Sequence, residues 1–141
     1  MANPAIIDAL RSLTDNGILH PEAVIDAARD PESPLHDQFT WDETEAARQY
    51  NLIEARKLIQ VHVEFLTPTS DPSPVFVSLR SDRPKGGGYR KMVDVLSKKA
   101  LREQLLEDAL ADLEHFRQKY HMIKELAGVF EAAKAVKRKA G

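Results

Sequence analysis

The sequence contains no cysteine, one tryptophan and only 6% aromatic residues. The lack of cysteine excludes disulfides, thiolate zinc sites and cysteine nucleophiles. No window approaches the roughly 18 uninterrupted apolar residues of a membrane-spanning helix. The N-terminal segment MANPAIIDALRSLTDNG lacks the basic and apolar regions of a signal peptide. We therefore expect a cytoplasmic protein that has no membrane partner.

The net charge of -2 averages over unlike parts of the chain. Residues 1–60 hold five basic and eleven acidic side chains, residues 61–97 hold five and four, and residues 98–141 hold ten and seven. Such asymmetry indicates a polyanion partner at the basic end. It argues against the N-terminal third as the main contact with that partner.

Two short helices are predicted at the N-terminus. Asn3 is predicted to cap the first helix, Pro4 to occupy its first position, and Gly17 to stop it. A second helix begins near Pro21 and ends by Asp30, because the residue before a proline is pushed out of the helical region. The pair is helix-turn-helix-like. The connector 31–41 carries three apolar anchors that we expect in the core: Leu35, Phe39 and Trp41.

A third helix is predicted to start at Asp42 or Thr40 and to end at Leu58. Thr40 and Glu43 have the spacing of a capping box, in which each side chain satisfies the other residue's backbone N–H. The helix carries one stripe formed by Ala46, Tyr50, Ile53 and Lys57 or Leu58.

From Ile59 the apolar period changes from 3.6 to 2, which predicts a strand with one buried face. A proline-rich tip separates it from a second strand, so residues 59–79 predict a β-hairpin. Three helices and a hairpin follow the order of a winged-helix domain. The predicted fold is α+β and mostly helical, with a winged-helix-like domain at 1–79, a basic glycine-rich segment at 80–97 and a long helix at 98–141.

The long helix has the strongest periodic signal of the chain. Its apolar residues step alternately by three and four, which is the spacing of a coiled-coil seam. A helix of roughly 40 residues would be about 60 Å long and would exceed the width of a small domain. It must bend at Gly128, fold back on the domain or pair with another copy. We predict a homodimer or other homo-oligomer joined through Leu106, Leu113, Phe116, Tyr120, Ile123 and Phe130.

The stretch from Arg80 to Arg102 concentrates positive charge, with eight basic residues against two acids. Contact with phosphates releases counterions, so such a segment favours a nucleic-acid backbone; an ordinary solvated face would have the same composition. The residues predicted to contact nucleic acid, most simply double-stranded DNA, are Arg80, Arg83, Lys85, Gly86, Gly87, Gly88, Tyr89, Arg90, Lys91, Lys98 and Lys99.

The three glycines in this stretch allow two interpretations. Their backbone N–H groups can close on a phosphate, or the run is only a flexible connection. The P-loop and Rossmann fingerprints are absent. In a winged-helix arrangement the third helix would read bases, although its four acids weaken this idea. The candidates there are Arg48, Gln49, Asn51, Arg56 and Lys57.

The sequence matches known signatures of catalytic residues only incompletely. His62 and Glu64 match half of a zinc deaminase signature, but the cysteines that would complete it do not exist. Glu64, Asp71 and Lys85 lack the carboxylate-x-Lys spacing of a metal nuclease. We therefore expect a protein that is not an enzyme, with no catalytic residue, no metal site and no cofactor.

Three phrases, ARDPESPLH, TWDETEAARQYNLIEARKLI and VFVSLRSDRPKGGGYR, resemble those of small uncharacterised proteins of tailed bacteriophages and prophages. The resemblance covers about residues 20–130. It implies a phage or prophage origin and therefore the host cytoplasm as location, but it assigns no chemical activity. Small phage proteins with a helical N-terminal module, a basic segment and an oligomerising helix include transcriptional regulators and small terminase subunits. The strands predicted before the long helix depart from the usual small-terminase layout.

Two functions follow as expectations. The first is an oligomeric, non-enzymatic DNA-binding protein of phage type, a regulator or a DNA-packaging accessory. The second is a protein-interaction module, such as a host-factor inhibitor or a virion assembly component, that uses the acidic residues 1–60.

Overall fold

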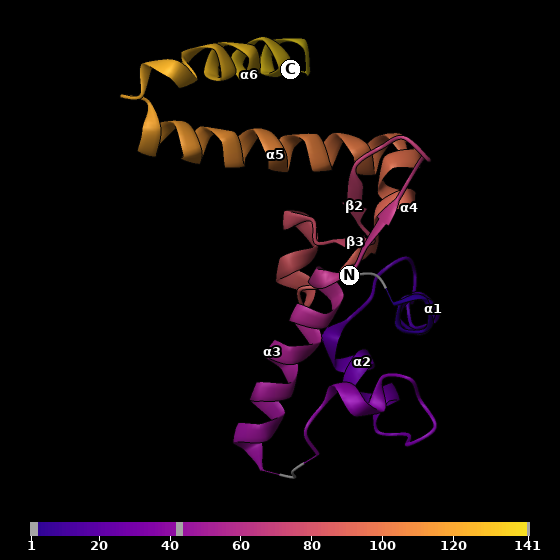
Figure 1. Ribbon diagram of the computed structural model, residues 1–141. Helices are drawn as coiled ribbons and strands as arrows, with labels where there is room; N and C mark the ends of the chain where they lie inside the picture. Colours follow the sequence, from indigo (N-terminus) through magenta and orange to yellow (C-terminus); the bar gives the residue numbers. More distant parts are fainter. Residues whose placement is uncertain (1–2, 42–43, 141) are drawn as a thin grey trace. The chain divides into compact units, whose positions relative to one another are not determined.

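The computed structural model describes residues 3–41 and 44–140, with the side chains of Lys85 and Ala140 outside the description. The chain divides into two compact units, residues 1–98 and residues 99–141. The fold is α+β and mostly helical, as predicted, with six α-helices and two small antiparallel sheets in the described residues (Figure 1).

Unit 1 opens with the two predicted helices, α1 (Pro4–Ser12) and α2 (Pro21–Ala28). The Asn3 side chain accepts a hydrogen bond from the backbone N–H of Ile6 at 3.4 Å, so the predicted cap is confirmed. Between the helices Asn16 and Gly17 have φ angles of 50° and 79°. Glycine adopts this left-handed conformation without cost, which explains why the chain reverses here.

Helix α3 (Glu45–Val61) starts later and ends later than predicted. Thr44 caps it, because its hydroxyl accepts a hydrogen bond from the N–H of Ala47 at 3.1 Å. The predicted start at Asp42 and the capping box with Glu43 fall on residues outside the description. The buried positions of α3 are Asn51, Ala55 and Ile59, spaced by four.

The predicted hairpin over 59–79 is only partly right. Ile59 is buried on α3, and the hairpin consists of β1 (Val63–Phe65) and β2 (Pro72–Pro74), paired antiparallel. The second predicted strand, Val75 to Leu79, leaves this sheet: β3 (Phe76–Val77) pairs instead with β4 (Arg90–Lys91). The shorter elements of unit 1 are η1 (His36–Gln38), η2 (Arg80–Lys85) and α4 (Met92–Ser97).

The core of unit 1 lies where α1, α2 and α3 meet the strands. Leu10, Leu19, Val24 and Ile59 are fully buried there. The connector 31–41 supplies the predicted anchors, with Leu35 and Phe39 buried and Trp41 packed against the same cluster. Burying side chains of this size contributes about 1.5–3 kcal/mol each, so this cluster holds unit 1 together.

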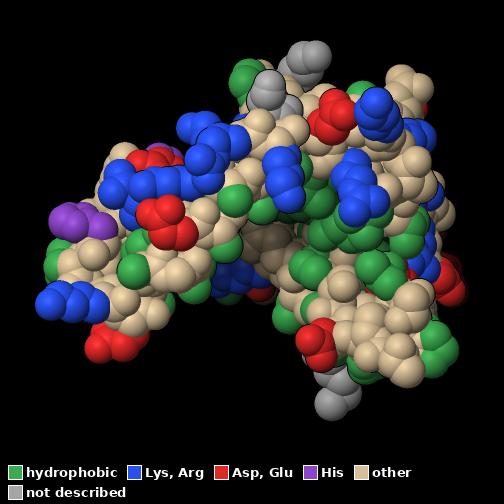
Figure 2. All heavy atoms as spheres, turned by 90° about the horizontal axis from the view of Figure 1, so that it is seen from above, with side chains coloured by type: hydrophobic (Ala, Val, Ile, Leu, Met, Phe, Trp, Pro, Cys, Tyr) green, Lys and Arg blue, Asp and Glu red, His purple; other side chains and the backbone are tan. Residues whose placement is uncertain are grey.

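Unit 2 is a helical hairpin rather than the single predicted helix. Helix α5 (Lys99–Tyr120) is followed by a turn, by η3 (Lys124–Leu126) and by α6 (Ala127–Ala140). The turn at 121–126 contains no glycine or proline, so nothing in the sequence marked it. The rings of Phe116 and Phe130 lie 6.2 Å apart across the hairpin. Basic side chains gather over α6 (Figure 2).

None of the helices within residues 3–41 and 44–140 combines the length and the apolar character needed to cross a membrane.

Candidate functional site

The basic segment of unit 1 is braced from within by one ion pair. Arg90 donates two hydrogen bonds to Asp82, at 2.7 Å from Nε and 3.0 Å from a terminal nitrogen. The Asp82 side chain is only 6% exposed. Hydrogen bonding to this carboxylate raises the pKa of Arg90 above its ordinary value. Arg90 therefore stabilises the fold, and its engagement with Asp82 does not fit the predicted phosphate contact.

The glycine run also serves the fold. Gly86 and Gly87 have φ angles of 95° and 67°, which end η2 with a left-handed reversal. The N–H of Gly87 donates to the carbonyl of Arg83 at 3.1 Å. Gly88 is buried, and a Cβ atom there would collide with the side chain of Ile18. The run is thus a turn and a close packing contact, rather than the predicted open cradle for phosphate.

Tyr89 ties this segment to the first loop of unit 1. Its N–H donates to the carbonyl of Leu19 at 2.7 Å, and the N–H of Leu19 donates back at 2.5 Å. The ring is buried, and its hydroxyl accepts a hydrogen bond from Gln60 at 2.9 Å. A stacking role for Tyr89 on nucleic-acid bases therefore does not fit this structure.

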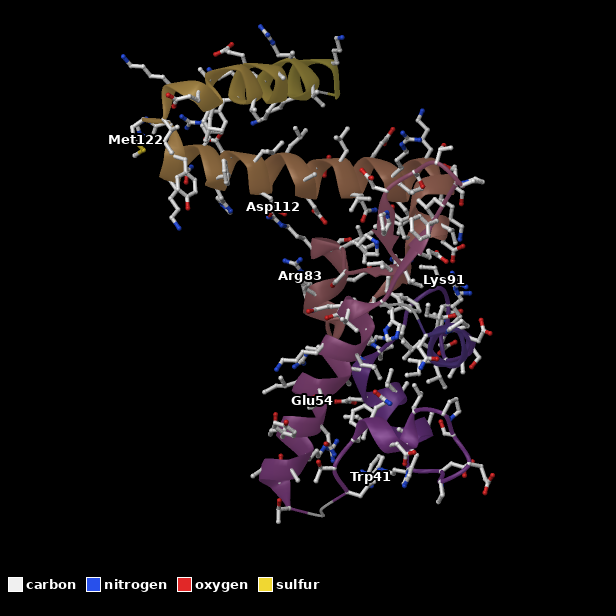
Figure 3. The ribbon with its side chains drawn as sticks, viewed as in Figure 1. Trp41, Glu54, Arg83, Lys91, Asp112 and Met122 are labelled. Carbon is white, nitrogen blue, oxygen red and sulfur yellow. The ribbon has the colours of Figure 1, made fainter. Side chains whose placement is uncertain are left out.

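The other predicted contacts differ in exposure and belong to both units. Arg80 and Lys91 are half-buried, and Lys98 is exposed at the end of α4. Lys99 begins α5 and belongs to unit 2. The side chain of Lys85 lies outside the described part of the structure. Of the three arginines of the basic segment that were predicted to contact phosphate, Arg83 is the exposed one, and it points outward from η2 (Figure 3).

Arg83 lines a hollow of about 510 Å³ on the surface of unit 1. Arg56 lines the same hollow from α3, and both arginines are exposed. None of the described residues around the hollow is acidic. They are Arg56, Gln60, Pro74, Phe76, Val77, Ser78, Arg83, Gly87 and Tyr89.

Neither Arg56 nor Arg83 forms an ion pair with any described carboxylate. The acids of α3 are engaged elsewhere: Glu54 lies 3.9 Å from Lys57, and Glu45 accepts a hydrogen bond from Gln49 at 3.1 Å. Two uncompensated guanidinium groups beside one hollow create a local positive potential that attracts anions. Arginine also matches phosphate oxygens in a bidentate geometry.

The exposed side of α3 leads into this hollow. Gln49, Ile53, Arg56 and Gln60 follow at intervals of four, three and four residues, so they form one ridge along the helix. Ile53 is 48% exposed. Beside the ridge lies Tyr50, 53% exposed, so the stripe of Ala46, Tyr50 and Ile53 faces solvent. We call Gln49, Ile53, Arg56 and Gln60 the α3 ridge.

One predicted base contact is wrong. Asn51 is only 4% exposed, and its amide donates to the carbonyl of Thr40 at 3.2 Å. Arg48, Gln49, Arg56 and Lys57 remain at the surface. Gln60 was missed because it was assigned to a strand. The signal that could have found it is the four-residue spacing of Asn51, Ala55 and Ile59, which continues the helix past residue 58.

No protein-family model, no curated protein and no solved structure matches the chain. Among the described residues, no three His, Asp or Glu side chains are grouped as a metal site requires.

Proposed function

We propose that this protein binds double-stranded DNA and catalyses no reaction on it. The α3 ridge lies in the major groove, and Arg83 contacts a phosphate beside that groove. The observation that carries this proposal is the hollow in which Arg56 and Arg83 meet no described acid. The resemblance to phage proteins suggests a regulator or a DNA-packaging accessory as the biological role.

The dimensions of α3 suit the major groove. Its 17 residues give a length of about 25 Å, and a helix with its side chains is about 10–12 Å wide. The major groove of B-DNA is about 12 Å wide and admits one helix. Arginine pairs well with guanine and glutamine with adenine. The ridge offers these side chain types in Gln49, Arg56 and Gln60.

The test measures the anisotropy of a labelled duplex of about 30 base pairs over a series of salt concentrations. Each phosphate contact contributes about 0.9 to the slope of log affinity against log salt. Arg83→Ala should lower the slope by about 1 and weaken binding to all sequences alike. Arg56→Ala should weaken binding and also reduce discrimination between sequences, by about 1–3 kcal/mol for a lost base contact.

Arg29→Ala is the matched control, because Arg29 is an exposed arginine of the same unit that does not line the hollow. It should leave both affinity and slope unchanged. Absence of binding at low salt, binding that does not respond to salt, or equal effects of Arg83→Ala and Arg29→Ala would each refute the proposal.

A second candidate is a protein-interaction module. It is favoured by the half-exposed apolar side chains of Tyr50, Ile53 and Val61 on α3, and by the exposed acids of α1 and α2, which include Asp8 and Glu22. Such a module would bind a protein partner with an affinity that survives Arg56→Glu and Arg83→Glu. The DNA-binding proposal requires both reversals to abolish DNA binding.

A further inference from the structure

Unit 2 leaves most of its apolar surface uncovered by its own residues. None of the 22 residues of α5, all of them described, is buried. On α6 the buried side chain among the described residues is Phe130, 7% exposed. Ordering a helix costs about 1–2 kcal/mol of backbone entropy per residue. A hairpin of two helices with one buried side chain does not offset this cost, so its apolar side needs a cover.

The uncovered residues form two stripes. On α5 Leu105, Ala109 and Phe116 share one side, spaced by four and seven residues. Leu105 is half-buried, Ala109 is exposed, and Phe116 is 45% exposed. On α6 Val129 and Val136 share one side, seven residues apart, and are 49% and 41% exposed. We call these five residues the hairpin stripe.

The opposite side of the hairpin combines charged and apolar side chains. A groove of about 470 Å³ lies between α5 and α6 on that side, and Glu107, Glu114, His115 and Lys134 are among its lining residues. No member of the hairpin stripe lines this groove. The charged side chains of the groove lie beside apolar ones, which are Leu110, Ala111, Leu113, Phe130 and Ala133.

We propose that the hairpin stripe docks the same stripe of a second copy of this chain, so that two hairpins form a four-helix bundle. Closed two-fold pairing of identical surfaces is the commonest assembly of soluble proteins. Bundles of this kind bury apolar positions of antiparallel neighbouring helices joined by short loops, and α5 and α6 are joined by the short segment 121–126.

The available area is sufficient for such a dimer. At 1.5 Å per residue α5 is about 33 Å long and α6 about 21 Å long. With helices about 10 Å apart, one side of the hairpin covers about 500 Å², or about 1,000 Å² for two copies before surface relief is counted. A specific interface should bury at least about 1,000 Å² of accessible surface. Accessible surface is larger than the flat area of the same contact, so two hairpins reach this value.

This contact differs from the predicted seam of one long helix. Leu113 and Phe130 line the groove between α5 and α6 and belong to the inside of the hairpin. Ile123 lies in the turn before η3. Of the other predicted residues, Phe116 belongs to the stripe, Tyr120 packs against it with ring centroids 4.7 Å apart, and Leu106 is 38% exposed. Val129 and Val136 join the proposed contact.

The test is the mass of the full-length chain in solution, measured by light scattering or analytical ultracentrifugation from about 1 to 100 µM. One chain has a mass of 15.8 kDa, and the wild type should show twice this value. Val129→Glu and Val136→Glu place a carboxylate in the stripe and should give monomers with an unchanged helical circular dichroism spectrum. The matched control, His115→Glu, places the same group on the groove side and should remain dimeric.

Three results would overturn the proposal. A wild type that is monomeric at 100 µM would mean that the stripe is covered otherwise, for instance by unit 1 of the same chain. A dimer that persists in the double variant of Val129 and Val136 would place the interface elsewhere. Loss of the dimer in His115→Glu alone would move it to the groove side.

Discussion

Replacing Asp82 by alanine tests the idea that the basic segment is braced from within. The carboxylate accepts two hydrogen bonds from Arg90, and the two side chains are 6% and 20% exposed. Removing one partner of a buried ion pair costs about 3–5 kcal/mol, because the other charge is left without compensation. Arg90 keeps some contact with water, so we expect a loss of about 2–3 kcal/mol.

Urea and thermal unfolding, followed by circular dichroism, measure this loss. For a unit of about 100 residues 1 kcal/mol corresponds to roughly 4 °C or more, so Asp82→Ala should lower the midpoint by about 8–12 °C. Glu131→Ala is the control: it breaks a pair at 3.4 Å whose side chains are 71% and 62% exposed. Exposed pairs contribute about 0–1 kcal/mol, so this variant should change little.

The double variant with Arg90→Met sharpens the test. If the cost of Asp82→Ala comes from a stranded guanidinium, removing Arg90 as well should recover part of the stability. A loss for Asp82→Ala no greater than that for Glu131→Ala, or a double variant as unstable as the sum of the two single changes, would refute the reasoning.

Two further variants test local features of unit 1. Gly88→Ala should destabilise the protein by about 1–3 kcal/mol in urea unfolding, because the new methyl group must displace Ile18 or the backbone, and a neutral effect would contradict the packing described here. Thr44→Ala should cost about 1 kcal/mol by the same measurement through loss of the α3 cap, whereas Thr40→Ala should be nearly neutral; the reverse order would restore Thr40 as the cap.

Short-range signals in the sequence predicted the beginning of the fold well. The cap at Asn3 and the reversal at Gly17 depend on residues within three or four positions of each other, so the local sequence is enough to predict them. The anchors Leu35 and Phe39 were recognisable because large apolar side chains are unusual in a connector. The mostly helical α+β class followed from the same local patterns.

The predictions that were wrong concern features that depend on contacts between residues distant in the sequence. Ile59 fits both a helix and a strand in sequence, and its burial in the core of unit 1 selects the helix. Arg90 looks like a surface cation until Asp82, eight positions earlier, is brought against it. The candidate site could not be predicted for the same reason. Arg56 and Arg83 line one hollow, but no local sequence pattern relates these two residues.

The pairing of Leu19 with Tyr89 has a consequence for how the chain is made. On a ribosome the N-terminal helices emerge first, but the strand-like partner of Leu19 is synthesised 70 positions later. Unit 1 therefore cannot complete its core until Tyr89 and the buried Val95 have left the exit tunnel. A nascent or truncated chain that stops at Leu79 would expose its apolar interior and become a substrate for chaperones and proteases.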